Sequence, residues 1–210
     1  MTHNELSVEN YNILLDTTKE NLSYSGSVEI NLNIHKKLNE VLLDSKGLNI
    51  HRCYIYDNKS KQYEIINHEI SDSKLSIKYN SLKSGSKIKL KIDFDGKITN
   101  NLKGIYASNY KTPNNKNEVL ISTQFEPTDA RKAFPCIDHP SYKAKFNLTL
   151  IIDSNLQAIS NMPIYKESKL NDYNTKIIFE ETPIMSTYLL FFAIGKIKCK
   201  EINTKNNITI

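Results

Sequence analysis

The side chains best suited to metal or nucleophilic chemistry are scattered along the chain rather than grouped. Five histidines occur, at positions 3, 35, 51, 68 and 139. A zinc site on a helix needs a spacing such as HExxH, and neither that motif nor an HxH pair is present. His35 and His51 could converge from neighbouring strands, but we favour solvated or core histidines. No serine lies in a G-x-S-x-G turn and no cysteine shares a motif with a histidine, so the chain carries no complete catalytic set.

A polar pair at positions 124 and 126 is the most suggestive feature of the remaining sequence. If this segment is a strand, Gln124 and Glu126 lie on one face and Phe125 lies on the other. That pattern suits two polar side chains that face a cleft while the phenylalanine is anchored in the core. It also describes the solvent side of an ordinary edge strand, and the pattern alone favours that interpretation.

Further charged residues follow the polar pair closely. Asp129, Arg131 and Asp138 are interpreted as loop architecture, because one arginine between two acids can form a bidentate pair that fixes the turn carrying Glu126. We assign these three residues no chemistry. Cys136, between two apolar neighbours, is most simply a small buried hydrophobic side chain.

The cysteines and the apolar runs indicate the compartment. Cys53, Cys136 and Cys199 are far apart and outside any CxxC pair, which argues against a disulfide framework and against a structural zinc site. The first residues show no charged-then-apolar signal design, and no apolar run approaches the ~20 residues that cross a bilayer. We therefore expect reduced thiols, a cytoplasmic protein and no membrane contact.

The positive charge is spread over the whole chain. Lysine and arginine number 28 against 23 acidic residues, for a formal net charge of +5. The densest basic stretch, residues 87–91, alternates with Ile88 and Leu90 as the solvated side of a strand does. A nucleic-acid binder concentrates its positive charge on one face, so we expect no nucleic-acid partner.

The elements that position these residues are predicted to be strands. Two-residue alternation of apolar and polar residues recurs over residues 28–34, 75–79, 88–94 and 146–152, with turn residues at 83–86 and 95–96 between repeats. Residues 188–194 are apolar almost throughout, as in a strand buried on both faces. The one helix-like piece is residues 127–133, where Thr128 or Asp129 could cap a single turn.

These elements predict an all-β fold with almost no helix, built as a large antiparallel sandwich of two packed sheets. A length of 210 residues fits one such domain, so residues 1–210 are expected to form a single β domain. The end of the sequence suggests a hairpin, with strands at 197–202 and 208–210, whose second strand stops in mid-pattern. We expect the chain to be a piece that ends before a following domain.

Three ordered motifs carry a family resemblance. The segment TQFEPTDARKAFPCIDHP, at residues 123–140, resembles the signature TQFE-x-x-DAR-R-AFPC-W-D-E-P in the N-terminal domain of aminopeptidase N-type (gluzincin) zinc metallopeptidases. AISNMP at 158–163 and TPIMSTYLLFFAIG at 182–195 are similar to later motifs of that family and occur in the same order. The opening strand and the step at residues 21–28 also resemble the family, and the similarity is weakest over residues 52–98.

The resemblance implies a function for the polar pair. In such enzymes this step of the N-terminal domain, which is saddle-like, projects two side chains into the catalytic cleft beside the metal. By that analogy Glu126 binds the free α-ammonium of a peptide substrate, since a carboxylate offers both charge and acceptors, and Gln124 contacts the first side-chain pocket. The family's catalytic tyrosine lies in the following domain, so Tyr188 is interpreted as a core residue.

The same resemblance limits what this chain does alone. The family's HExxH motif and G-x-MEN loop belong to the following catalytic domain, so we expect zinc in the full-length enzyme and none bound by this chain. No metal ligand and no catalytic residue is assigned here. The expected partners are peptides with a free N-terminus and the protein's own catalytic domain, and the chain by itself should not hydrolyse peptides.

Departures from the family pattern and two alternative functions complete the analysis. Ile137 stands for a tryptophan, His139 for a glutamate and Asn10 for a histidine, and all three look structural. The chain could be a non-catalytic scaffold or interaction module of the same fold, or could belong to the epoxide-hydrolase branch, where Gln stands at position 126. The glutamate retained at position 126 favours the peptidase over both.

Overall fold

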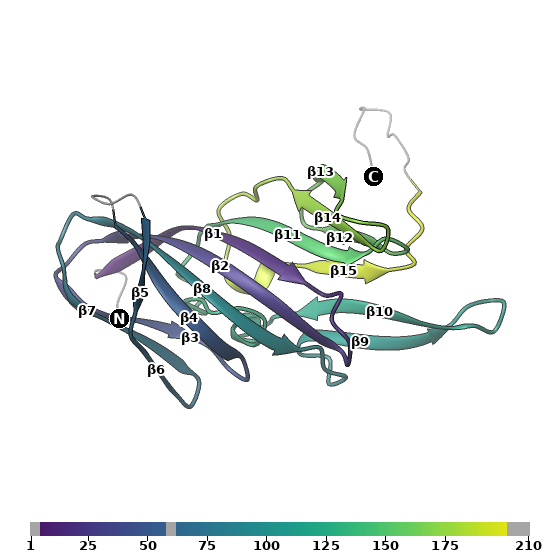
Figure 1. Cartoon of the computed structure of the whole chain (residues 1–210), viewed down its shortest axis with the longest axis horizontal. Coiled ribbons are helices and arrows are strands. Elements are labelled where there is room, and N and C mark those ends of the chain that lie inside the picture. The colour runs from purple at the N-terminus through teal and green to yellow at the C-terminus, as the bar shows by residue number, and fades with distance from the viewer. Residues whose placement is uncertain (1–4, 58–61, 201–210) are drawn as a thin grey trace.

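The computed structural model describes residues 5–57 and 62–200, and strands make up most of them (Figure 1). Within these ranges the only helical pieces are two 3-10 helices of 3 residues each, η1 (Ala130–Lys132) and η2 (Thr187–Leu189). No helix in the described part has the length and apolar character needed to cross a membrane. The prediction of an all-β fold with almost no helix is confirmed.

The largest sheet has eight strands. Their order is β13 (Ile164–Lys169), β14 (Asn174–Phe179), β11 (Lys145–Asp153), β1 (Leu6–Asp16), β2 (Ser23–Ile34), β8 (Lys87–Lys97), β4 (Asn49–Asp57) and β5 (Gln62–Ile66). Neighbouring strands are antiparallel except β1 and β11, which pair in parallel with Tyr11 opposite Phe146. Parallel neighbours need a long crossover connection, which the segment between these two strands supplies.

Two smaller sheets complete the fold. The first contains, in order, β12 (Gln157–Ser160), β15 (Phe192–Gly195), β10 (Asn117–Gln124) and β9 (Gly104–Lys111), and the second contains β3 (Leu38–Asp44), β7 (Lys74–Leu82) and β6 (His68–Ser71). Buried side chains of all three sheets join one contiguous core, which confirms the sandwich-like arrangement. The sequence predicts two packed sheets, whereas the described residues form three, because β3, β6 and β7 pair among themselves while β4 and β5 extend the large sheet.

The alternation read from the sequence matches the burial of the strands. In β2 every second residue is buried, and Val28, Ile30, Leu32 and Ile34 are each at most 1% exposed. Strands β8 and β11 alternate in the same way. One face of the large sheet therefore removes its apolar side chains from water and holds the core, while the other face remains polar.

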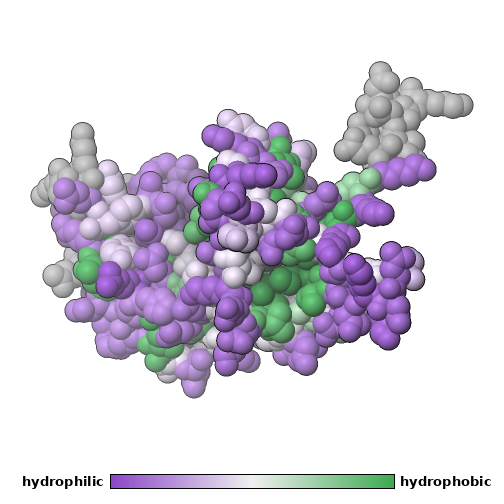
Figure 2. Space-filling model, turned by 45° about the vertical axis from the view of Figure 1, so that its right-hand side comes forward, coloured by the Kyte–Doolittle hydropathy of each residue, from purple (hydrophilic) through white to green (hydrophobic). Residues whose placement is uncertain are grey.

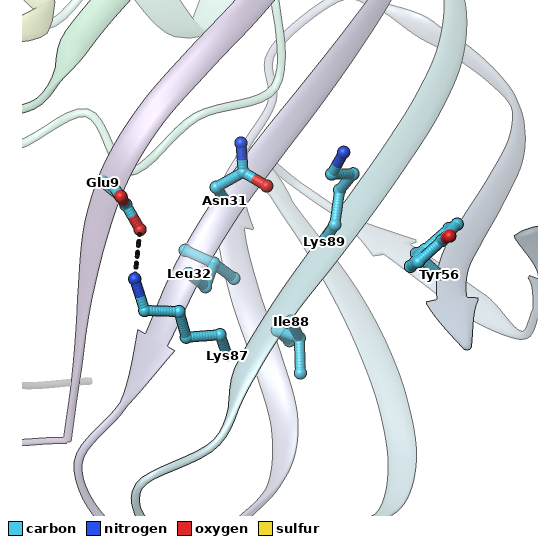
Figure 3. A pocket seen from close by; sticks show the side chains of 7 residues that line it. All are labelled: Glu9, Asn31, Leu32, Tyr56, Lys87, Ile88 and Lys89. Carbon is cyan, nitrogen blue, oxygen red and sulfur yellow. Dashed lines mark hydrogen bonds and ion pairs between the residues drawn. The ribbon is translucent and has the colours of Figure 1, made fainter. Parts of the chain in front are cut away.

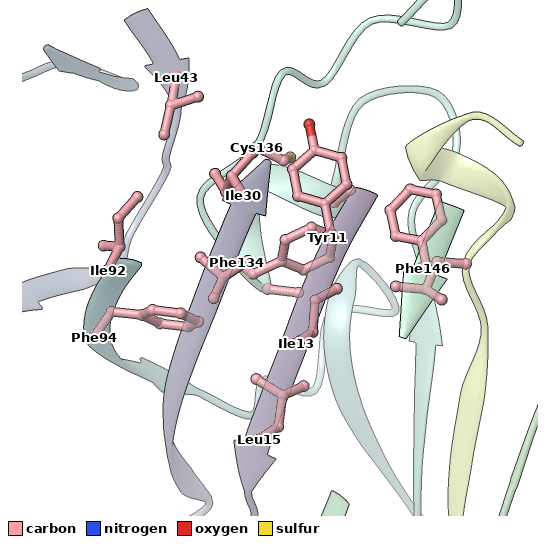
Figure 4. Close-up of a cluster of buried hydrophobic side chains, with 14 of the residues drawn as sticks. Tyr11, Ile13, Leu15, Ile30, Leu43, Ile92, Phe94, Phe134, Cys136 and Phe146 are labelled. Carbon is pink, nitrogen blue, oxygen red and sulfur yellow. The ribbon is translucent and has the colours of Figure 1, made fainter. Parts of the chain in front are cut away.

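The centre of the core is aromatic (Figure 4). Tyr11 of β1 and Phe146 of β11 stack with ring centroids 5.2 Å apart, and both rings are fully buried. Phe134 packs edge-on against Tyr11 at 6.0 Å. Phe134 belongs to residues 125–140, which lie between β10 and β11 and are called the 125–140 loop below. The core of the large sheet is thus in direct contact with this loop.

A glycine predicted to mark a turn lies inside a strand instead. Asp95 and Gly96 are part of β8, and Gly96 is directly opposite Tyr24 of β2. A Cβ atom at position 96 would lie 2.2 Å from the Tyr24 ring, so this glycine allows a close approach of side chain to backbone. The predicted turn at residues 83–86 is present, with Gly85 at a φ of 79° between β7 and β8.

Three local predictions differ from the structure or fall outside it. Residues 188–194 do not form one strand: Tyr188 and Leu189 lie in η2, and only β15 is buried throughout. The N-cap of η1 is Asp129, one of the two predicted candidates, but its side chain makes no capping hydrogen bond, because the carboxylate pairs with Lys132 at 2.7 Å. Most of the predicted terminal hairpin, residues 201–210, lies outside the described residues.

Candidate functional site

Gln124 and Glu126 lie where the four-stranded sheet meets the 125–140 loop. Gln124 is the last residue of β10 and pairs with Gly104 of β9. Both polar side chains are exposed, whereas Phe125 between them is 1% exposed. Within the described residues, neither polar side chain has a hydrogen-bond or ion-pair partner, and the Glu126–Pro127 peptide is cis. The predicted alternation across residues 124–126 is therefore present.

A chain of aromatic contacts anchors this step to the core. The ring of Phe125 packs edge-on against Phe134 with centroids 6.2 Å apart. Phe134 contacts Tyr11, which in turn stacks on Phe146. The Tyr11 hydroxyl also accepts a hydrogen bond from the backbone N–H of Ile137 at 3.1 Å. Four buried rings thus hold the backbone beside Glu126: that of Phe125 itself, that of Phe134 later in the loop, and those of Tyr11 and Phe146 in the large sheet.

Backbone hydrogen bonds close the loop on itself and on the large sheet. The N–H of Asp129 donates to the carbonyl of Phe125 at 2.8 Å, which forms a tight turn around Glu126. The buried hydroxyl of Tyr24 lies 3.1 Å from the carbonyl oxygen of Lys132 and 2.9 Å from that of Ala133. Because these carbonyls receive a donor inside the core, the loop after η1 is fixed to β2.

One charged cluster ties the loop to two distant segments. The guanidinium of Arg131 bonds the Asp138 carboxylate through Nε at 3.0 Å and the Asp138 carbonyl through Nη2 at 2.9 Å. Its Nη1 atom lies 3.0 Å from Oδ1 of Asp44, at the end of β3. Lys74 also contacts that oxygen, at 2.6 Å, and the Thr187 hydroxyl donates to Asp138 at 2.7 Å. These five residues are called the Arg131 cluster.

The expected arginine bridge is present with a different second acid. The sequence predicts Arg131 between Asp129 and Asp138, but Asp44 occupies the second place, because Asp129 is neutralised by Lys132. Asp44 lies far from the loop in sequence, so local spacing carried no sign of it. Asp44 directly follows the apolar residues 41–43, and that pattern does not identify a partner.

The cluster is electrically balanced and largely buried. Two carboxylates face two cations, and the side chains of Asp138 and Asp44 are 1% and 8% exposed. Burial lowers the pKa of the Arg131 guanidinium, but its hydrogen bond to Asp138 and the nearby charge of Asp44 outweigh burial and leave that pKa raised. Arg131 is therefore a fixed cation that holds the loop.

Cys136 lies beside this cluster, and its chemistry is suppressed. Burial, together with the negative charges of Asp138 and Asp44, raises the pKa of its thiol well above the ordinary value. The thiolate is the nucleophilic form of cysteine, so this thiol is inert at neutral pH. The prediction that Cys136 is a small buried side chain is confirmed, since it is 0% exposed.

The residues that depart from the family pattern have structural surroundings. Ile137 is buried in the core at 6% exposure. The exposed His139 accepts the N–H of Ser141 at Nδ1 and packs edge-on against Tyr142. Asn10 accepts a hydrogen bond from Asn31 on the neighbouring strand at 2.6 Å. None of these contacts involves the exposed side chains of Gln124 and Glu126.

The described part of the chain contains no group of three or more potential metal ligands. His35 bonds Ser7 at 2.9 Å, whereas His51 pairs with Asp95 at 2.9 Å, so these two histidines do not converge.

One hollow lies elsewhere, on the polar face of the large sheet (Figure 3). It is lined by Glu9, Asn31, Leu32, Tyr56, Lys87, Ile88 and Lys89. Its charges already have partners: Lys87 pairs with Glu9 at 3.0 Å, and Lys89 lies over the ring of Tyr56 at 5.6 Å. Such contacts are those of an ordinary solvated sheet surface, so we assign this hollow no site.

Comparisons with known proteins agree with the motifs. Residues 7–189 match the Peptidase M1 N-terminal domain family. The chain is 41% identical over 193 residues to "Probable aminopeptidase 2" of Sulfurisphaera tokodaii and 38% identical over 193 residues to "Leucyl aminopeptidase" of Saccharolobus solfataricus, covering 91% and 90% of this chain. It is 36% identical to "Aminopeptidase N" of Lactococcus lactis over 215 residues, 96% of this chain.

The chain spans only 22% of the length of the first two relatives and 23% of the third. The part that it matches contains the 125–140 loop and every element of the Arg131 cluster, because the family match runs from β1 to the end of η2. The agreement thus covers motifs, fold and nearly the whole length of this chain, and the chain belongs to the Peptidase M1 N-terminal domain family.

Proposed function

We propose that this chain is the N-terminal domain of a zinc-dependent aminopeptidase that removes N-terminal residues from peptides. Its contribution is one wall of the catalytic cleft and the recognition of the substrate's free α-amine. The relatives named as aminopeptidases support this proposal, as does the intact QFE step in the sequence. Hydrolysis itself belongs to the rest of the protein, where zinc would supply the activated water.

Glu126 is the proposed ligand for the substrate ammonium. The observation that carries this assignment is a contrast: its carboxylate is exposed and has no partner among the described residues, although the backbone around it is held firmly. A carboxylate on a fixed backbone can offer charge and acceptor oxygens to a cation at a defined place. Gln124, exposed two residues earlier, would contact the side chain of the first substrate residue.

The partner of this domain would be the remainder of the longer protein. Large apolar side chains are exposed at the end of the four-stranded sheet, with Ile159 38%, Phe191 36% and Leu189 48% exposed. Asn161 bonds the backbones of Leu189 and Phe191 at 2.9 and 2.8 Å, so the segment is held in place. Figure 2 shows hydrophobic surface amid hydrophilic side chains on the face drawn there. Apolar surface of this kind suits an interface.

We also propose that the protein is cytoplasmic, and the environment of its thiols supports this location. All three cysteines are free, and two of them are buried in different parts of the core. Disulfides form and persist in oxidising compartments, and a protein built with separate unpaired thiols suits a reducing one.

Glu126→Gln in the full-length enzyme tests the proposed amine contact. The change keeps size and an acceptor oxygen but removes the charge. Because a charge-assisted hydrogen bond contributes roughly 1.5–3 kcal/mol, kcat/KM for an aminoacyl reporter with a free amine should fall about ten- to two-hundred-fold. The zinc content should be unchanged, and the N-acetylated form of the same reporter, already a poor substrate, should lose little.

The control is Glu167→Gln, which makes the same chemical change at an exposed position on β13. It should leave kcat/KM for both reporters at the wild-type value. If Glu126→Gln left the preference for free-amine over acetylated reporter unchanged, Glu126 would be an ordinary surface residue and the proposed role would be wrong.

A further inference from the structure

Asp44 makes several contacts with the 125–140 loop, although it lies outside the loop. Its side chain is 8% exposed. Oδ1 contacts Lys74 at 2.6 Å and Arg131 at 3.0 Å, while Oδ2 accepts the backbone N–H of Asp138 at 3.0 Å. Its backbone also pairs with that of Cys136 through two hydrogen bonds, of 2.6 and 3.1 Å. The end of β3 therefore holds the far half of the 125–140 loop.

Arg131 transmits this contact to the near half of the loop. Its guanidinium joins Asp44 to Asp138, and its own backbone N–H donates to the Asp138 carboxylate at 3.2 Å. The carbonyl of Arg131 accepts the N–H of Lys46, just after β3, at 2.9 Å. Both the side chain and the backbone of Arg131 are thus tied to the same end of the three-stranded sheet.

Glu126 depends on these ties for its place. Its own side chain has no partner among the described residues, so the fold positions the carboxylate only through the Glu126 backbone from which the side chain extends. That backbone is fixed on one side by buried Phe125 and on the other by the turn from Asp129, which leads directly into η1 and Arg131. A shift of Arg131 would be passed to Glu126 through this short turn.

We propose that Asp44 is a positioning residue for substrate binding: acting through Arg131, it sets the place of the Glu126 carboxylate. This inference rests on the proposed function of Glu126. Asp44 touches no substrate in this scheme. Its effect is orientation, and misplacement of a binding group by about 1 Å can cost up to about a hundred-fold in rate even when the mutated residue is remote.

The test compares Asp44→Asn, Glu126→Gln and the double variant in the full-length enzyme. Asparagine keeps the shape of Asp44 but weakens its hold on Arg131. We expect Asp44→Asn to lower kcat/KM for the free-amine reporter about ten-fold while the acetylated reporter changes little, so the preference for a free amine falls. In the Glu126→Gln background the same change should lower that preference no further, because there is no charge left to position.

Asp95→Asn is the matched control. Asp95 also pairs with two side chains, Lys19 at 2.8 Å and His51 at 2.9 Å, but it lies on the polar face of the large sheet. This variant should keep the wild-type preference. If Asp44→Asn fails to fold, Arg131→Lys replaces it, because lysine keeps the charge but cannot bridge both acids. The preference should then fall as well.

The outcomes separate the two proposals. An unchanged preference in Glu126→Gln overturns the proposed function itself. The positioning role alone is overturned if Glu126→Gln loses the preference but Asp44→Asn keeps it, either because Asp44→Asn lowers kcat/KM equally for both reporters or because it lowers neither. Asp44 is then a structural residue. A lost preference in both single variants, with no further loss in the double variant, supports the inference.

Discussion

Replacing Arg131 by methionine should destabilise the domain more than the same replacement of a lysine that forms a single ion pair. Methionine keeps an unbranched stem that reaches about as far as the Nε atom of arginine, but it removes every polar contact of the guanidinium. Asp138, 1% exposed, would then keep the Thr187 hydroxyl and the N–H of Arg131's own backbone as donors. Asp44 would keep Lys74 and the N–H of Asp138.

The size of the effect follows from these remaining contacts. Removing one partner of a buried ion pair costs about 3–5 kcal/mol, because the other charge is left uncompensated. Arg131 is 20% exposed and some donors remain, so we expect the lower end, about 3 kcal/mol. For a domain of this length, one kcal/mol corresponds to roughly 2–4 °C in Tm, so the expected decrease is about 6–12 °C.

Differential scanning calorimetry of the 210-residue chain measures this decrease, and its neighbour provides the control. Lys132→Met removes a cation that forms one pair with Asp129; because the Asp129 side chain, at 13% exposure, is closer to solvent than those of Asp138 and Asp44, the loss should be smaller, about 1–2 kcal/mol. A second variant, Arg131→Met with Asp138→Asn, removes the uncompensated charge and should recover part of the loss. Equal decreases for Arg131→Met and Lys132→Met, or no recovery in the double variant, would refute the buried-charge argument.

Two further predictions concern buried groups near the core. Tyr24→Phe removes the hydroxyl that donates to the carbonyls of Lys132 and Ala133, so urea unfolding should show a free energy of unfolding lower by about 1–2 kcal/mol. An unchanged free energy of unfolding would mean that this hydrogen bond does not stabilise the fold. Titration with a disulfide reagent at pH 8 should modify exposed Cys199 rapidly and the other two thiols only on unfolding. Burial raises the pKa of Cys53 to about 12 and that of Cys136 well above its ordinary value, so almost no thiolate forms at either residue at pH 8. Rapid reaction of a second thiol in the folded protein would contradict this prediction.

The features that the sequence predicts well are those with a local physical cause. Alternation identified β2, β7, β8 and β11 because a half-buried strand must place apolar residues at every second position. The burial of Phe125 between exposed Gln124 and Glu126 follows from the same geometry. Family membership could be inferred because three motifs occur in the same order as in the family.

The features that the sequence missed depend on distant partners. The parallel pairing of β1 with β11 joins residues more than a hundred positions apart, and the contact of Asp44 with Asp138 joins residues 94 positions apart. No local pattern encodes either of them. Gly96 looked like a turn residue because glycine is common in turns, yet here the close ring of Tyr24 requires it within a strand. The apolar run at 188–194 could not be divided correctly, since a 3-10 turn and a buried strand share the same composition.

The firm attachment of the 125–140 loop bears directly on whether Glu126 can serve as an amine ligand. A charge-assisted hydrogen bond contributes roughly 1.5–3 kcal/mol, while ordering the backbone of a mobile segment costs roughly 1–2 kcal/mol for each residue. On a mobile loop, ordering only a few residues would cancel the bond to the substrate. Here the rings around Phe125, the Tyr24 hydroxyl and the Arg131 cluster order the loop during folding. Binding then has to immobilise little more than the Glu126 side chain, at about 0.5–1.5 kcal/mol, so a net attraction for the ammonium remains.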